Sequence, residues 1–98
     1  DKLRRKYPKP LNKWNDYSQL KKDLDPYLHN WLEALEKLDL TNRENVFCTL
    51  SFIYPHLPID DLANYMCITK DAFMVRKARI VKKLEITSTQ FVGFLQSL

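Results

Sequence analysis

The sequence contains a single glycine, Gly93, among its 98 residues. This scarcity excludes the glycine-rich phosphate loops of Walker-type and dinucleotide-binding proteins. It also argues against a β protein rich in hairpins, because tight hairpin turns need residues that tolerate a positive φ. No apolar run is long enough to cross a membrane, yet apolar residues make up 45% of the chain, too many for a disordered polypeptide. The composition therefore predicts a small helical domain with one modest core.

Cysteine is scarce as well. Cys48 and Cys67 each have apolar neighbours in the sequence, which predicts two small buried side chains in a reducing compartment. A zinc site needs about four ligands at short paired spacing, and Cys48, His56 and Cys67 do not have that spacing. We therefore expect no metal and no cofactor.

The candidate groups for catalysis are equally few. Asp60 and Asp61 are adjacent, so on a helix they cannot both face one substrate. His29 and His56 stand apart from any nucleophile or carboxylate arranged as a triad. We expect no catalytic residues and no small-molecule substrate.

The net charge is only +4, but its distribution along the chain is uneven. Residues 1–13 contain six basic residues and one acidic residue, and residues 70–86 contain six basic and two acidic residues. The region between them is acidic. Clustered positive charge is typical of proteins that bind a polyanion. Because the chain begins with Asp1 and has no signal region, we interpret it as a piece of a longer protein.

Apolar spacing and capping residues predict an all-α bundle of about six short helices. Residues 1–11, with two prolines and many bases, predict a basic linker or arm with no fold of its own. Asn12 is expected to cap a helix over 12–24, and Asp25-Pro26 to restart a second helix over 26–38. Further helices are expected over 42–54, 58–66, 70–84 and 87–98, with capping boxes at Thr41–Glu44 and Thr87–Gln90 and a cap at Thr69.

A short helix, a tight turn and a longer basic helix follow one another over residues 58–84, which is the order of a helix-turn-helix. On the helix over 70–84, the 100° spacing places Phe73, Ile80, Val81 and Leu84 on an inner face, with Lys77 unexpectedly beside them. The outward sector and its flanks carry Met74, Val75, Arg76, Ala78, Arg79, Lys82 and Lys83. Small apolar residues suit thymine methyl groups, and arginine suits guanine or phosphate.

From Leu40 onward the sequence resembles the LuxR/FixJ/NarL-type DNA-binding domain, a four-helix helix-turn-helix. The resemblance rests on ordered elements at the family's spacing: Leu40-Thr41-x-Arg43-Glu44, Leu50, Leu62-Ala63, Ile68-Thr69, and Ile80-x-x-Lys83-Leu84-x-Ile86-x-Ser88. Within the expected helical extension over 12–39, residues 14–39, with their aromatic helix and the Asp25-Pro26-Tyr27 restart, resemble the extension that precedes this domain in bacterial regulators with tetratricopeptide repeats and a membrane segment. Glu85 departs from the family, which usually has a glycine there, at a position that often favours a positive φ.

The resemblance implies an effector domain over 40–98 that binds double-stranded DNA, in the cytoplasm or as the cytoplasmic part of a membrane-anchored regulator whose membrane segment would lie upstream. The DNA contacts that it carries over fall on Met74, Val75, Arg79 and Lys83, and charge and facing add Arg76 and Lys82. A homodimer is expected through the apolar last helix, by Phe91, Phe94, Leu95 and Leu98. For Phe91 and Leu95, closing the core is the equally weighted alternative.

A second hypothesis is a helical protein-interaction module that keeps the fold but has lost the DNA contacts. Its docking surface would be Trp14, Tyr17 and Trp31. The alternative interpretation of these aromatic residues, that they form the core, is the favoured one.

Overall fold

Helices make up the regular structure of residues 2–98, the part of the chain that this computed structural model describes; Asp1 lies outside it. No strand occurs within that range, so the predicted all-α class is confirmed. The elements in chain order are α1 (Lys2–Lys6), the 3-10 helix η1 (Asn12–Asn15), α2 (Tyr17–Glu36), α3 (Asn42–Ile53), α4 (Ile59–Tyr65), α5 (Lys70–Lys83), the 3-10 helix η2 (Ser88–Gln90) and α6 (Phe91–Gln96).

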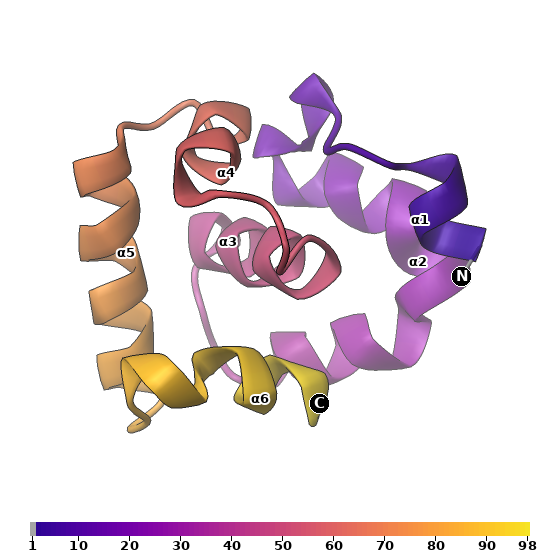
Figure 1. Cartoon of the computed structure of the whole chain (residues 1–98). Coiled ribbons are helices and arrows are strands. Elements are labelled where there is room, and N and C mark those ends of the chain that lie inside the picture. Colours follow the sequence, from indigo (N-terminus) through magenta and orange to yellow (C-terminus); the bar gives the residue numbers. More distant parts are fainter. Residues whose placement is uncertain (1) are drawn as a thin grey trace.

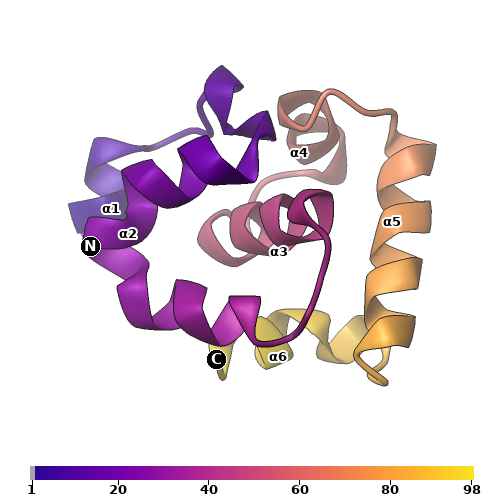
Figure 2. The same cartoon turned by 180° about the vertical axis from the view of Figure 1, so that it is seen from behind.

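Helix α3 is the centre of the fold, and the other helices surround it (Figures 1 and 2). Eight of its twelve residues are buried, so it has hardly any solvent-exposed face. Its start is fixed by the capping box predicted from the sequence: Thr41 Oγ1 accepts from the Glu44 amide, and Glu44 Oε1 accepts from the Thr41 amide. A buried central helix with a fixed start sets the positions of the elements that pack on it.

The prediction of an arm without structure over residues 1–11 is wrong for the described residues 2–11. Lys2–Lys6 form a helix, Leu3 is buried, and the hydroxyl of Tyr54 donates to the carbonyl oxygen of Tyr7 at 2.6 Å. Lys6 Nζ lies 5.6 Å from the centroid of the Tyr7 ring. The basic residues hid this packing, because the few side chains that contact the core, those of Leu3, Tyr7 and Leu11, show no helical spacing.

The predicted pair of helices over 12–24 and 26–38 is confirmed in part: α2 consists of two helical limbs that meet at a kink at Leu28, and the short 3-10 turn η1 precedes them. Asn12 does not cap it; the side chain of Asp16 accepts from the Ser18 amide at the start of α2. Asp25 does not cap a restart either, because its carboxylate contacts His29 at 2.9 Å. The helix continues through Pro26 and breaks at Leu28, which has non-helical backbone angles.

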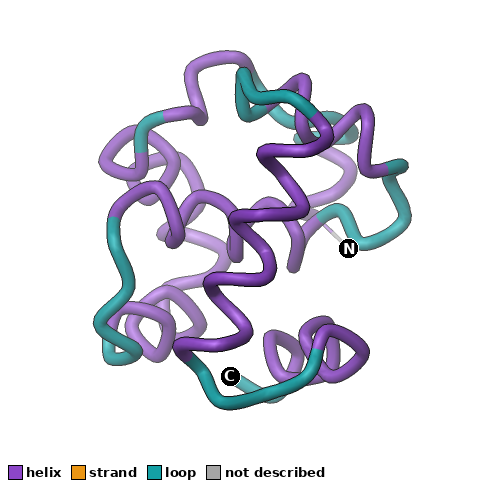
Figure 3. Tube along the Cα trace, turned by 90° about the vertical axis from the view of Figure 1, so that its left-hand side faces the viewer, coloured by secondary structure: helices purple, strands orange, loops and turns teal. Residues whose placement is uncertain are grey.

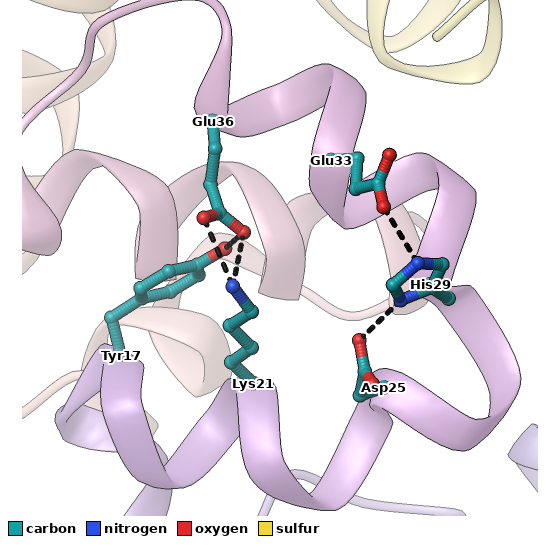
Figure 4. Close-up of polar contacts among 6 residues, drawn as sticks. All are labelled: Tyr17, Lys21, Asp25, His29, Glu33 and Glu36. Carbon is teal, nitrogen blue, oxygen red and sulfur yellow. Dashed lines mark hydrogen bonds and ion pairs between the residues drawn. The ribbon is translucent and has the colours of Figure 1, made fainter.

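The bend in α2 brings its two ends into contact. Over the 19 residues from Tyr17 to Glu36 a straight helix would rise about 28 Å, yet the Tyr17 hydroxyl donates to Glu36 Oε2 at 3.0 Å. Lys21 Nζ lies 2.9 Å from the same carboxylate oxygen (Figure 4). Burial, together with the contact with Glu36, raises the pKa of the Tyr17 hydroxyl. The two limbs of α2 are therefore held together at Glu36.

The aromatic residues proposed above as a docking surface lie in the core instead. Trp14, Tyr17 and Trp31 are each at most 7% exposed. Trp31 stacks on Phe52 with ring centroids 4.3 Å apart, and its Nε1 donates to the carbonyl oxygen of Leu95 at 2.8 Å. The favoured interpretation of these residues as core is confirmed, and the extension over 12–39 shares one core with the helices that follow.

His29 bridges two carboxylates on opposite sides of the break in α2 (Figure 4). Its Nδ1 lies 2.9 Å from Asp25 Oδ1 and its Nε2 lies 2.6 Å from Glu33 Oε1. The hydrogen bond to Asp25 and the charge of Asp25, followed by that of Glu33, raise the pKa of the imidazole. The protonated form is therefore favoured in the folded state.

Replacing this histidine should change how stability depends on pH. Because the folded pKa is raised, the stabilisation is fully present below the ordinary histidine value of about 6.5 and is lost as the pH rises through the folded value. Between about pH 6 and about pH 8, wild type should lose more free energy of unfolding than His29→Gln, as measured by urea denaturation. His56→Gln, which removes a histidine with no ion pair among residues 2–98, is the control. Equal losses in wild type and His29→Gln would contradict the prediction.

Candidate nucleic-acid interface

The α4 and α5 helices are joined by a tight turn and lie at a steep angle to each other (Figure 1). The turn is a Schellman motif: the Ile68 amide donates to the Ala63 carbonyl oxygen at 3.0 Å, and Cys67 occupies the left-handed position with φ 60°. Thr69 then caps α5, as predicted, by accepting from the Ala72 amide at 3.1 Å. These local bonds fix where α5 begins.

One face of α5 anchors it to the core. Phe73 and Ile80 are buried, and the Phe73 ring packs on Phe47 of α3 with centroids 4.6 Å apart. Lys77, which the helical spacing placed on this inner side, is half-buried and extends its ammonium to 5.7 Å from the centroid of the Phe91 ring. The aliphatic stem of a lysine can cover apolar surface while its charge reaches solvent, so the inner face tolerates this cation.

The opposite face of α5 is uncovered (Figure 3). Met74 and Val75 are 45% and 50% exposed, and Arg79 and Lys82 are exposed as well. Neither Arg79 nor Lys82 has an ion pair within the described part of the chain. Four of the predicted contact residues thus share one accessible face, with two unpaired cations.

Lys83 is engaged elsewhere. Its Nζ lies 2.7 Å from Glu44 Oε1, the carboxylate that also caps α3. Burial raises the pKa of Glu44, but Lys83 and the Thr41 amide outweigh burial, and the net pKa of this carboxyl is lowered. Lys83 therefore ties the end of α5 to the start of α3 and is only partly free for a polyanion.

Arg76 also departs from the outward face. It is half-buried and, with Arg43 of α3, lines a pocket of about 270 Å³ at the α4–α5 turn. Charge and facing predicted Arg76 as a DNA contact, and Arg43 was singled out only as part of the motif from Leu40 to Glu44. Because these two arginines are 33 positions apart in the sequence, no local pattern predicts that they line the same pocket.

Two of the four residues of the last helix that were assigned to a dimer interface lie in the core. Phe91 and Leu95 are 2% and 0% exposed, and Phe91 packs towards Phe47 with ring centroids 6.0 Å apart. The assignment of these two residues to a dimer interface is therefore wrong, because they close the core. Phe94 and Leu98 are half-buried, and their role in a dimer stays a prediction.

The two cysteines differ in a way that the sequence did not indicate. Cys48 is buried as predicted, and burial raises the pKa of its thiol to about 12. Cys67 is exposed, contrary to the prediction, because it sits at the outer corner of the turn.

Within residues 2–98, no three histidine, cysteine or acidic side chains converge as metal ligands. None of the helices in that range is both long and apolar enough to span a bilayer.

Comparisons of this chain with protein-family models, with curated proteins and with solved structures find no match.

The end of α5 offers a test of the local geometry. The helix closes with a second Schellman motif, in which the Ile86 amide donates to the Val81 carbonyl oxygen at 3.0 Å and Glu85 takes the left-handed position at φ 57°. A side chain in this conformation is disfavoured, and an acid is also unfavourable near the negative end of the helix dipole. Glu85→Gly should therefore stabilise the protein by about 1 kcal/mol, as measured by urea denaturation.

Lys82→Gly is the control for this variant, because Lys82 has a helical backbone three residues earlier. Glycine there should destabilise by about 1 kcal/mol. A loss of stability in both variants would show that position 85 does not require the left-handed conformation.

Proposed function

We propose that the chain binds double-stranded DNA by placing the outward face of α5 in the major groove. The observation that carries the proposal is the uncovered face of α5, on which Arg79 and Lys82 have no ion pair in the described residues and flank exposed Val75. The protein would act as the effector domain of a bacterial transcription regulator, as the motif from Leu40 to Glu44 suggests.

The dimensions of α5 suit this role. Its fourteen residues span about 21 Å, and a helix with its side chains is about 10–12 Å across, close to the width of the major groove of about 12 Å. Phe73 and Ile80 hold the inner face against the core, so the helix can enter a groove without leaving its own fold.

The side chains on that face divide between positioning and base contact. Lys82 is an exposed cation that can neutralise a phosphate and release a counterion. Arg79, three residues earlier on the same face, can bind guanine through two N–H groups of its guanidinium. Val75 and Ala78 are small exposed apolar residues that can contact a thymine methyl group. Asp71 lies in the first turn of α5, so a phosphate would be repelled at the amino-terminal end of this face.

Pairing of two copies would add specificity, because dimers bind two half-sites at a fixed spacing. Phe94, Leu98 and the exposed Val92 are the apolar side chains of the last helix that the core leaves partly accessible. We propose that two copies contact each other through these side chains, without Phe91 and Leu95.

Removing Arg79 should weaken sequence-specific binding. A duplex is first selected from a random library, and its affinity is then measured by fluorescence anisotropy at several salt concentrations. Arg79→Ala should cost about 1–3 kcal/mol and relax preference at one position of the duplex. Lys82→Ala should weaken all duplexes alike and reduce the slope of log affinity against log salt by about one.

Lys22→Ala is the control, because Lys22 is exposed on α2, at the opposite side of the molecule from α5 (Figures 1 and 2). It removes the same charge and should leave specific binding nearly unchanged. Absence of any duplex binding at about 50 mM salt, where electrostatic binding is strong, would overturn the proposal. Such a result would favour a protein-interaction module instead.

A further inference from the structure

The pocket beside the α4–α5 turn lies between four elements. Asn15 from η1, Arg43 and Val46 from α3, Met66 and Ile68 from the turn, and Arg76 from α5 line a volume of about 270 Å³. Pockets for drug-sized ligands start at about 300 Å³, so this one suits a smaller molecule. It sits on the flank of α5 and not on the outward face described above.

Two guanidinium groups, those of Arg43 and Arg76, line this pocket. Neither Arg43 nor Arg76 forms an ion pair within residues 2–98. No acidic residue lines the pocket. The carboxylate next to Arg43 in sequence, that of Glu44, is already bound by Lys83 Nζ at 2.7 Å and by the Thr41 amide at 2.9 Å. The fold therefore brings two positive charges to this pocket and gives the carboxylate of Glu44 other partners.

The rest of the lining is apolar or can form hydrogen bonds. Val46 and Met66 are buried, and Ile68 is half-buried, so together they give an apolar wall. Asn15 adds an amide that can donate to an oxygen. Arginine binds carboxylate and phosphate through paired N–H groups, and two unpaired arginines match a dianion better than a single negative charge.

We propose that this pocket binds a small phosphate monoester, with the phosphoryl group between Arg43 and Arg76 and the organic group against Val46, Met66 and Ile68. A phosphate monoester carries about −1.5 to −2 charges at pH 7, whereas a DNA backbone phosphate is a diester with about one. The proposal does not rest on DNA binding, because Arg43 and the apolar wall lie outside the face assigned to DNA.

The test is a titration of the isotope-labelled full chain with phenyl phosphate, followed by backbone amide shifts. We expect saturable shifts confined to the amides around Arg43, Met66–Ile68 and Arg76. Phenyl phosphate should also slow alkylation of the exposed Cys67 thiol, which lines the same pocket. Benzoate, which has the same ring and one charge, should bind at least several-fold more weakly.

Substitutions decide whether the pocket or general charge is responsible. Arg43→Gln should weaken phenyl phosphate binding about tenfold or more, the scale of one lost charge-assisted bidentate contact. Arg5→Gln removes the same charge from an exposed side chain of α1 and should leave binding unchanged. Because Arg43 is exposed and has no ion pair within residues 2–98, a thermal unfolding curve should show that both variants fold.

A duplex competition assay separates the two sources of phosphate. If the selected duplex fails to displace phenyl phosphate, the site takes a free monoester, as proposed. If the duplex displaces it and Arg43→Gln weakens duplex binding as much as Arg79→Ala does, the pocket is a backbone-phosphate contact and the proposal is overturned. Linear shifts without saturation, or equal weakening by Arg5→Gln and Arg43→Gln, would overturn it as well. None of these outcomes overturns DNA binding by α5. That proposal is tested separately, by whether the chain binds a duplex at all.

Discussion

The packing of Phe73 on Phe47 is the contact on which the rest of the structure depends. Phe47 is fully buried at the middle of the central helix, and it contacts both Phe73 of α5 and Phe91 of α6. With Ile80, this contact fixes the rotation of α5 about its own axis. Because one face is buried by these side chains, the opposite face with Arg79 has to lie in solvent. A rotation of α5 by about 100°, one residue, would bury a cation in the core at a large cost.

The bent α2 provides the second constraint. Glu36 receives hydrogen bonds from Tyr17 and Lys21 across the bend, which folds the helix around the core (Figure 4). This arrangement carries η1, at the start of the extension, to the edge of the α4–α5 turn, where Asn15 helps to line the pocket. The extension and the helix-turn-helix region therefore share one core, and the candidate ligand pocket exists only because the two meet.

Local signals predicted most of the fold, and long-range contacts account for what they missed. The caps at Thr41 and Thr69 and the limits of the helices from residue 42 onward follow from residues within one or two turns. The family's usual glycine indicated the left-handed conformation that Glu85 adopts. Pro26 indicated an interruption in the extension, which the structure has at Leu28. The helix at the amino-terminal end depends on a partner far along the chain, so no spacing rule indicates it. The outward face of α5 was predictable from its period alone. The burial of the inner side of α6 and the meeting of two arginines in the pocket were not, because both are set by packing between distant segments.

The proposal that DNA contacts the face of α5 opposite Phe73 can be tested by mapping the contact surface. The measurement is the change in backbone amide shifts of the isotope-labelled chain on adding a selected duplex. We expect the largest changes along Met74, Val75, Ala78, Arg79 and Lys82, with small changes on α2, which lies on the far side of the molecule. Changes of similar size spread over the basic residues of the amino-terminal segment and α2, with none concentrated on α5, would contradict it.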